Sequence, residues 1–138
     1  MPRIKLTFPD KKLFTSVIPV RITDINYGNH VGNDAFVQYI QEARMQWLSS
    51  LGFTELNIGG KGLIMADLVV TYRKEVFYGD ILSVELFAGD VEAISFSFYY
   101  RIINQQQVLV AEAKTGMVCY DYALKKVSAL PPAFAAIL

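Results

Sequence analysis

The residues best suited to chemistry lie in one short polar segment, 24–34, which reads Asp-Ile-Asn-Tyr-Gly-Asn-His-Val-Gly-Asn-Asp. It is dense in turn formers, holds the only histidine of the chain, His30, and leads into a stretch of helical periodicity that starts near Asn33. The first N–H groups of a helix have no partner within it, and the positive end of the helix dipole lies there. Such a site can stabilise a developing oxyanion while neighbouring polar side chains orient a water molecule.

Each of these side chains also has a structural interpretation. Asn33 and Asp34 are suited to cap a helix, Asp24 and Asn26 are common turn residues, and His30 could be a hydrogen-bonded structural histidine. Taken one by one, the residues favour this structural interpretation. Taken together, five polar side chains before a long apolar helix strengthen the chemical one.

Other common chemistries have no counterpart in the sequence. It contains neither a glycine-rich phosphate loop followed by Lys and Ser or Thr, nor a serine within Gly-x-Ser-x-Gly. One histidine and one cysteine exclude a multi-histidine or thiolate metal site. Cys119 falls inside a strand-like block, and we interpret it as a buried, inert thiol.

Length and charge predict one domain, residues 1–138, and exclude some partners. The 138 residues are 53% hydrophobic, which is enough for one core without disulfides or metal. The 13 basic and 13 acidic side chains cancel, which argues against nucleic acid or an anionic membrane as a partner. A ligand that carries phosphates must therefore be held by local cations.

The expected location is cytoplasmic. A single cysteine cannot form an internal disulfide, and residues 1–10 lack the long apolar run of a signal peptide. No apolar run approaches the roughly 20 residues that span a bilayer. The mean hydropathy of +0.30 therefore indicates a large core or a buried subunit interface.

Hydrophobic periodicity predicts one long helix followed by a meander of strands. The helix is expected over 33–51, capped by Asn33 and ended by Gly52, with an apolar stripe of Phe36, Ile40, Ala43, Trp47, Leu48 and Leu51. Short turns favour antiparallel pairing between strands expected over 13–22, 63–74, 80–89, 93–103 and 107–122. Pro19 marks the first strand as irregular or at an edge, and a short helix is expected after Pro131. The pattern predicts an α+β fold in which the helix packs against a curved antiparallel sheet.

Two segments resemble the hot-dog acyl-CoA thioesterases of the 4-hydroxybenzoyl-CoA thioesterase type. That family's signature is Asp-x-Asp-x-x-Gly-His-Val-Asn-Asn followed by a helix with Glu-Ala-Arg, and the matching residues in 21–48 are Asp24, His30, Val31, Asn33 and Glu42-Ala43-Arg44. Residues 69–86, which include Tyr72 and Tyr78-Gly79-Asp80, resemble the family's second strand and the turn after it. The resemblance implies a hot-dog fold, one long helix wrapped by a curved antiparallel sheet of five or six strands.

This sequence departs from the signature at the centre of the site. The family's second Asp, usually the catalytic carboxylate, is Asn26 here, its Gly before His is Asn29, and its first Asn after Val is Gly32. An amide cannot act as a base, although it can orient a water or donate to a thioester carbonyl. The backbone N–H that polarises the thioester carbonyl in the family corresponds to that of Asn33.

Three side chains are candidates for the missing base. His30 lies in the same loop, and an imidazole can take a proton from water at neutral pH. Asp24 corresponds to the family's first Asp and could equally serve as an acceptor that fixes the loop. Asp67 interrupts an apolar strand, so it either faces solvent or lies in a low-dielectric cleft. Glu42, roughly opposite the apolar stripe, is interpreted as solvated or in contact with another subunit.

The resemblance implies hydrolysis of an acyl-CoA thioester in a cleft between two protomers, hence a homodimer or a homotetramer. No cofactor is expected, because CoA is part of the substrate. Asn26 and His30 would orient the water, and the N–H of Asn33 would stabilise the oxyanion. The candidates for substrate binding are Tyr27, Asn29, Arg73 and Lys74, the last two for the CoA phosphates.

Two other functions remain open at this point. A hot-dog hydratase or dehydratase also uses a histidine, with a carboxylate of the facing subunit. A non-catalytic binder of acyl thioesters is consistent with an asparagine at the usual catalytic position, Asn26.

Overall fold

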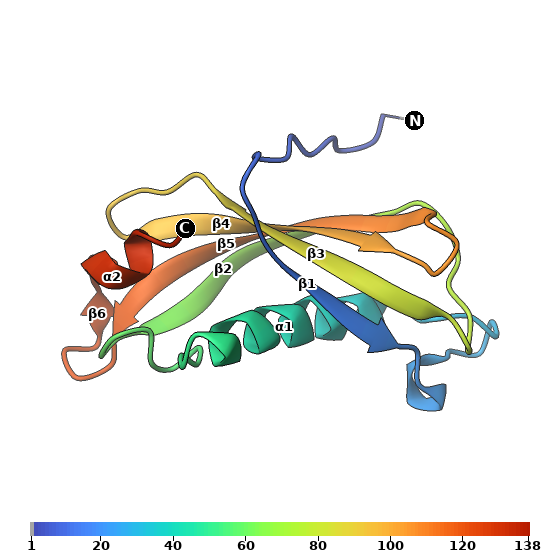
Figure 1. The fold of residues 1–138 in the computed structure, drawn as a ribbon, viewed down its shortest axis with the longest axis horizontal. Helices are drawn as coiled ribbons and strands as arrows, with labels where there is room; N and C mark the ends of the chain where they lie inside the picture. Colours follow the sequence, from blue (N-terminus) through green and yellow to red (C-terminus); the bar gives the residue numbers. More distant parts are fainter. Residues whose placement is uncertain (1) are drawn as a thin grey trace.

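The computed structural model describes residues 2–138 and places one long helix, α1 (Asn33–Ser50), across one face of a six-stranded antiparallel sheet (Figure 1). The strand order is β1-β3-β4-β5-β2, and the short β6 pairs with β5. The strands are β1 (Lys12–Pro19), β2 (Gly62–Tyr72), β3 (Ile81–Gly89), β4 (Ser95–Ile103), β5 (Leu109–Asp121) and β6 (Lys126–Val127), and a short helix, α2 (Pro132–Ala135), follows. The predicted α+β hot-dog fold is confirmed.

The first strand is shorter than predicted. The sequence predicts a strand over 13–22, but β1 ends at Pro19, and residues 22–24 form a short 3-10 helix instead. The N–H of Val20 still donates to the carbonyl of Asp80 at 3.0 Å, so the pairing continues one residue past Pro19 before the chain turns into the 3-10 helix. As Pro19 suggested, β1 is an edge strand. The second strand also ends early, at Tyr72, and β6 was not predicted because two residues show no alternation.

The apolar stripe of α1 packs on the inner face of the sheet. Phe36, Ile40, Ala43, Trp47 and Leu48 are all buried, whereas Leu51 is 43% exposed because the helix ends before it. Gly52 follows with φ of 79°, a left-handed conformation that ends helices and that glycine adopts at little cost. Among residues 2–138, no helix combines the length and the hydrophobicity needed to cross a membrane.

A buried polar network joins the middle of α1 to the sheet. The guanidinium of Arg44 donates to Glu55 at 3.0 Å and to the hydroxyl of Tyr100, on β4, at 3.2 Å. That hydroxyl also lies 2.7 Å from the Thr115 hydroxyl, on β5. Burial raises the pKa of Tyr100 to about 12, so its phenol stays protonated. The arginine of the Glu-Ala-Arg motif is therefore a structural residue in this chain.

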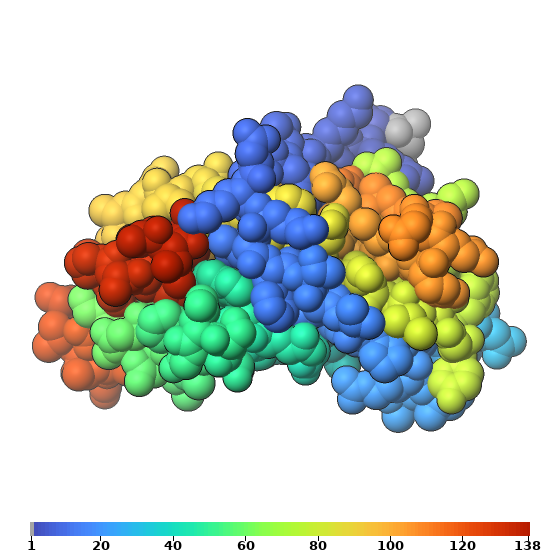
Figure 2. Space-filling model, in the orientation of Figure 1, coloured from blue at the N-terminus to red at the C-terminus, as the bar shows by residue number. Residues whose placement is uncertain are grey.

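The outer face of the sheet, opposite α1, carries a ladder of alternating charges. Glu85 accepts from Lys12 at 2.9 Å and lies 3.8 Å from Arg101, and Glu112 in turn lies 4.0 Å from Arg101 and 2.8 Å from Arg73. The N-terminal segment crosses this face, as Figures 1 and 2 show in blue above the sheet. The outer face is thus partly covered by the chain's own first residues.

Candidate active site

A hollow of about 200 Å³ opens beside the first turn of α1, and we call it the His30 hollow. The loop before α1, the first turn of the helix and the end of β2 with the residues after it form its walls. The residues that line it are His30, Val31, Asn33, Phe36, Tyr72, Arg73, Lys74, Glu75 and Val76. Four of the residues singled out in the sequence, His30, Asn33, Arg73 and Lys74, thus border one hollow.

The loop that carries His30 is held by its own backbone bonds. The N–H of Asn26 donates to the carbonyl of His30 at 2.9 Å, and the N–H of Asn29 donates back to the carbonyl of Asn26 at 3.1 Å. Asn29 has φ of 64°, the left-handed region that glycine adopts freely and asparagine tolerates better than most residues. The family's glycine at this position is therefore replaced by a residue that accepts the same backbone.

The imidazole of His30 is oriented so that one nitrogen is free. Its Nδ1 lies 3.1 Å from the carbonyl of Val31, which can only accept, so Nδ1 carries the proton when this bond forms. Nε2 then holds the lone pair and can take a proton from water. Val31 is itself fixed, because its N–H donates to the carbonyl of Val76 at 2.7 Å.

Asn26 lies next to His30 with its amide nitrogen unused. Its Oδ1 accepts the N–H of Gly28 at 2.8 Å, whereas its Nδ2 donates to no acceptor within residues 2–138. A Cβ on Gly28 would stand 3.1 Å from His30 Nε2 and 3.2 Å from Asn26 Oδ1. A side chain at position 28 would crowd both groups, so Gly28 leaves room for the imidazole and the amide.

The backbone N–H of Asn33 is the other functional group of the hollow. Asn33 is the first residue of α1, and its N–H has no acceptor within the described chain. The prediction that Asn33 caps the helix is wrong: the N-cap is Gly32, which has no side chain to bond the helix. The first turn is therefore left with free donors at the positive end of the helix dipole, where they can stabilise an oxyanion.

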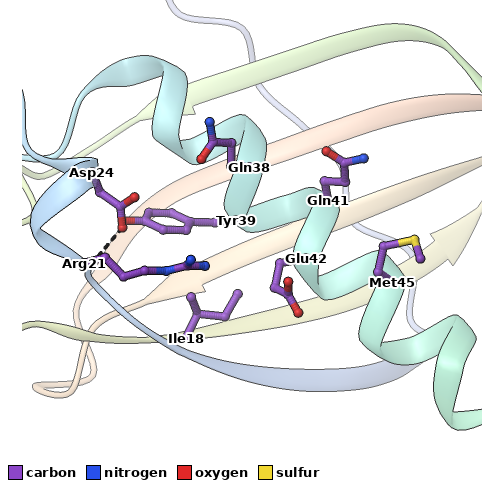
Figure 3. A pocket seen from close by; sticks show the side chains of 8 residues that line it. All are labelled: Ile18, Arg21, Asp24, Gln38, Tyr39, Gln41, Glu42 and Met45. Atoms are coloured by element: carbon purple, nitrogen blue, oxygen red, sulfur yellow. Dashed lines mark hydrogen bonds between the residues drawn. The ribbon is translucent and has the colours of Figure 1, made fainter.

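Asp24 faces a different hollow, on the β1 side of α1. Figure 3 shows its carboxylate beside Tyr39 and Arg21. The hollow that these residues and Glu42 line has a volume of about 270 Å³. Its Oδ2 accepts the Tyr39 hydroxyl at 2.7 Å and the Arg21 backbone N–H at 2.9 Å. Burial and the nearby Asp24 carboxylate raise the pKa of Tyr39, so this hydroxyl remains a donor. These contacts fit the interpretation of Asp24 as an acceptor that fixes the loop.

Asp67 lies away from the His30 hollow within the chain. Its Oδ1 accepts the N–H of Gly116 at 2.8 Å, and it borders a hollow that Asp90 and Lys114 also line. Tyr72 is five positions further along β2, which in an extended strand is a distance of about 17 Å. Of the three candidate bases, the structure places only His30 in the hollow with Asn33.

The four candidate binding residues do not all lie at the His30 hollow. Arg73 and Lys74 both line the hollow, but Arg73 donates to Glu112 at 2.8 Å, so its charge is already compensated. The side chain of Tyr27 is fully exposed at the tip of the loop, and Asn29 is exposed beside it. Neither of these two lines the hollow in the single chain.

Sequence reasoning missed Tyr72 as a site residue. Its ring packs edge-on against Phe36 at 5.2 Å, and its hydroxyl donates to the carbonyl of Asn33 at 2.9 Å. Burial and the Asp34 carboxylate raise its pKa, so the phenol keeps its proton. Its position at the end of a strand in the family-like block 69–86 was the available signal. Tyr72 ties β2 to the helix start.

Comparison with known proteins shows the family of this chain. A family model described as the thioesterase-like superfamily matches residues 20–138. The chain belongs to the thioesterase-like superfamily. The family predicted from the sequence and the enzyme class, a thioester hydrolase, are thereby confirmed.

Individual known proteins match along most of the chain. Acyl-CoA thioester hydrolase YbgC of Escherichia coli is 25% identical over 122 residues, 86% of this chain and 91% of its own. The PA2801 protein of Pseudomonas aeruginosa superposes with a TM-score of 0.83 at 29% identity, over 91% of this chain and 98% of its own. Slr0204, a 1,4-dihydroxy-2-naphthoyl-CoA thioesterase from Synechocystis, superposes with a TM-score of 0.82 at 27% identity, over 90% of this chain and 93% of its own.

Proposed function

We propose that this superfamily member hydrolyses an acyl-CoA thioester to the free acid and CoA. The observation that carries the proposal is the meeting, in one hollow, of the unpaired N–H of Asn33 and the imidazole of His30. An oxyanion donor and a general base are the two groups that hydrolysis of a thioester needs. The names of YbgC and Slr0204 point to CoA thioesters as the substrate class.

The proposed reaction begins with a water held between His30 and Asn26. Nε2 of His30 takes a proton as the water oxygen attacks the thioester carbonyl, and the amide Nδ2 of Asn26 helps to orient the reactants. The tetrahedral oxyanion is stabilised by the N–H of Asn33. The C–S bond then breaks, and the proton on the imidazole passes to the leaving CoA sulfur.

We further propose that the complete cleft forms between two protomers. β2 is an edge strand of 11 residues, and two of its apolar side chains, Ile64 and Met65, are 38% and 40% exposed. The His30 hollow, about 200 Å³, is smaller than the sites of about 300–1,000 Å³ that bury a ligand. A second chain at the β2 edge would supply the missing wall.

The proposal is tested with a panel of acyl-CoAs that differ in chain length and aromaticity. Wild type is expected to hydrolyse at least one of these acyl-CoAs, and its turnover should depend on the imidazole of His30 as the general base. His30→Gln should lower kcat by about 10²- to 10⁴-fold, the usual contribution of a general base, with an unchanged melting temperature. Asp67→Asn tests the alternative base and should retain activity, because this carboxylate lies outside the hollow. Glu92→Gln, an exposed acid in the turn between β3 and β4, is the control.

If His30→Gln had a near-normal kcat, the general base would be another group. The non-catalytic binder is the second candidate function, favoured by Asn26 in place of a carboxylate. It predicts saturable binding of acyl-CoA by wild type with no turnover.

A further inference from the structure

The first residues of the chain form a strap that is fastened to the outer face of the sheet, and we call residues 2–11 the N-terminal strap. The ring of Phe8 packs against Phe87 at 5.4 Å and against Tyr99 at 5.5 Å. The guanidinium of Arg101 lies 4.4 Å above the Phe8 ring, a cation–π contact. Phe87 and Tyr99 are 7% and 6% exposed, so this anchor is largely withdrawn from water and sets the path of the strap.

The strap leads Arg3 to the wall of the His30 hollow. Nη1 of Arg3 donates to the backbone carbonyl of Tyr72, at the end of β2, at 3.2 Å. Tyr72 itself lines the hollow and bonds the first residue of α1, Asn33, through its hydroxyl. A residue 69 positions away in the sequence therefore lies beside the candidate active site.

The charge of Arg3 is not compensated where it lies. Within the described residues no carboxylate comes within 4 Å of it, and a single carbonyl occupies one of its five N–H donors. Arg73, which the sequence suggested for phosphate binding, is instead neutralised by Glu112 at 2.8 Å. Lys74, which lines the hollow, likewise has no carboxylate within 4 Å among the described residues. The one acidic residue that lines the hollow is its neighbour, Glu75.

We propose that Arg3 on the N-terminal strap holds the phosphates of the CoA nucleotide, an inference that rests on the proposed acyl-CoA hydrolysis. A guanidinium offers a planar pair of donors that matches a phosphate, and the bond is strengthened by charge. The chain has no net charge, so phosphates must be attracted by local cations, and Arg3 is one that no acid neutralises. Arg3 acts on binding, not on the chemical step.

The test compares two thioesters of the same acyl group, one on CoA and one on pantetheine, which lacks the nucleotide. Arg3→Gln should raise KM for the acyl-CoA about tenfold, the loss of one charge-assisted contact, with kcat unchanged. KM for the acyl-pantetheine should not change. Arg3→Lys should restore part of the affinity, and Lys126→Gln, an exposed cation on β6, should leave both KM values unaltered.

Phe8→Ala gives a second route to the same result. It removes the anchor, so the strap should detach and KM for acyl-CoA should rise as in Arg3→Gln, again without effect on acyl-pantetheine. Equal KM for acyl-CoA in wild type and Arg3→Gln would overturn the proposal, and so would an equal rise for both substrates.

Binding of the isolated nucleotide separates this inference from the proposed hydrolysis. Calorimetry with adenosine 3′,5′-bisphosphate should give a Kd that rises about tenfold in Arg3→Gln. If wild type binds the nucleotide in this way but hydrolyses neither thioester, the proposed reaction fails and the phosphate contact stands. If wild type does not bind the nucleotide, the phosphate contact is refuted whatever the hydrolysis assays give.

Discussion

Single residues in the loop before α1 depart from the family signature with different physical consequences. Asn29 replaces glycine at a position with φ of 64°, a backbone that asparagine also adopts, so the loop keeps its shape. Asn26 replaces a carboxylate with an amide, which removes a base but keeps a hydrogen-bonding group beside His30. The first change preserves geometry and the second changes chemistry.

Asn26 therefore decides between a working hydrolase and a binder. In the hydrolase, Asn26→Asp adds a carboxylate within reach of the same water and should raise kcat, whereas Asn26→Ala should lower kcat or affinity. In a binder, Asn26→Asp is expected to create weak hydrolysis where wild type has none. Steady-state kinetics and acyl-CoA binding of both variants give the answer. If both behave like wild type, the site does not lie in this loop.

At the scale of elements, the turn between β3 and β4 is fastened through the carboxylate of Asp90, which contacts two other residues. The hydroxyl of Tyr99, on β4, donates to the carboxylate of Asp90 at 2.5 Å, and Lys114 lies 3.7 Å from the same oxygen. The hydrogen bond from the Tyr99 hydroxyl is the main reason that the pKa of Asp90 lies below its ordinary value. Burial, followed by the same contact, raises the pKa of Tyr99 to about 12. The charged form of Asp90 thus favours the folded state.

This contact should make stability depend on pH in the acid range. A carboxylate with a depressed pKa in the folded state stabilises it above the ordinary pKa near 4, and this contribution is lost as pH falls further. Asp90→Asn should lower the free energy of unfolding at pH 7 by no more than about 1 kcal/mol, because solvent screens a half-exposed carboxylate. Urea unfolding at pH 7 and at pH 3 should show the difference shrinking at acid pH. A constant difference would assign it to something other than the charge.

At the scale of the whole molecule, the two edges of the sheet are built differently. β1 begins at Lys12 and ends at Pro19, two residue types that discourage pairing with another chain. β2 runs from Gly62 to Tyr72 without lysine or proline, has Asp67 as its one charged residue, and leaves Ile64 and Met65 38% and 40% exposed. The β2 edge is therefore the one suited to a second protomer.

We expect wild type to have a mass near twice the 15.5 kDa of one chain in light scattering at micromolar concentration. Met65→Lys places a charge on the β2 edge and should yield monomers with impaired hydrolysis, because the cleft loses a wall. Val17→Lys, at a 61% exposed position on the opposite edge strand, is the matched control and should remain dimeric. A monomeric wild type would contradict the proposed cleft between protomers.

Local patterns in the sequence determined much of this molecule. The helix over 33–50 follows from its apolar stripe and from Gly52, and the strands after residue 62 follow from alternation and short turns. The loop of His30 and its family resemblance were legible because the signature is contiguous. These features depend on residues within a few positions of one another.

Only the tertiary structure decided which candidate residues meet. Arg73 pairs with Glu112, 39 residues away in sequence, because β2 and β5 lie side by side. Arg3 bonds Tyr72, 69 residues away, because the strap crosses the sheet. Asp67 shows the physical reason most directly. A bulge at residue 66 shifts the register between β2 and β5, and in a strand a shift of one residue moves the following side chains to the opposite face. Strand alternation read from the sequence cannot locate such an insertion, so it could not place this carboxylate.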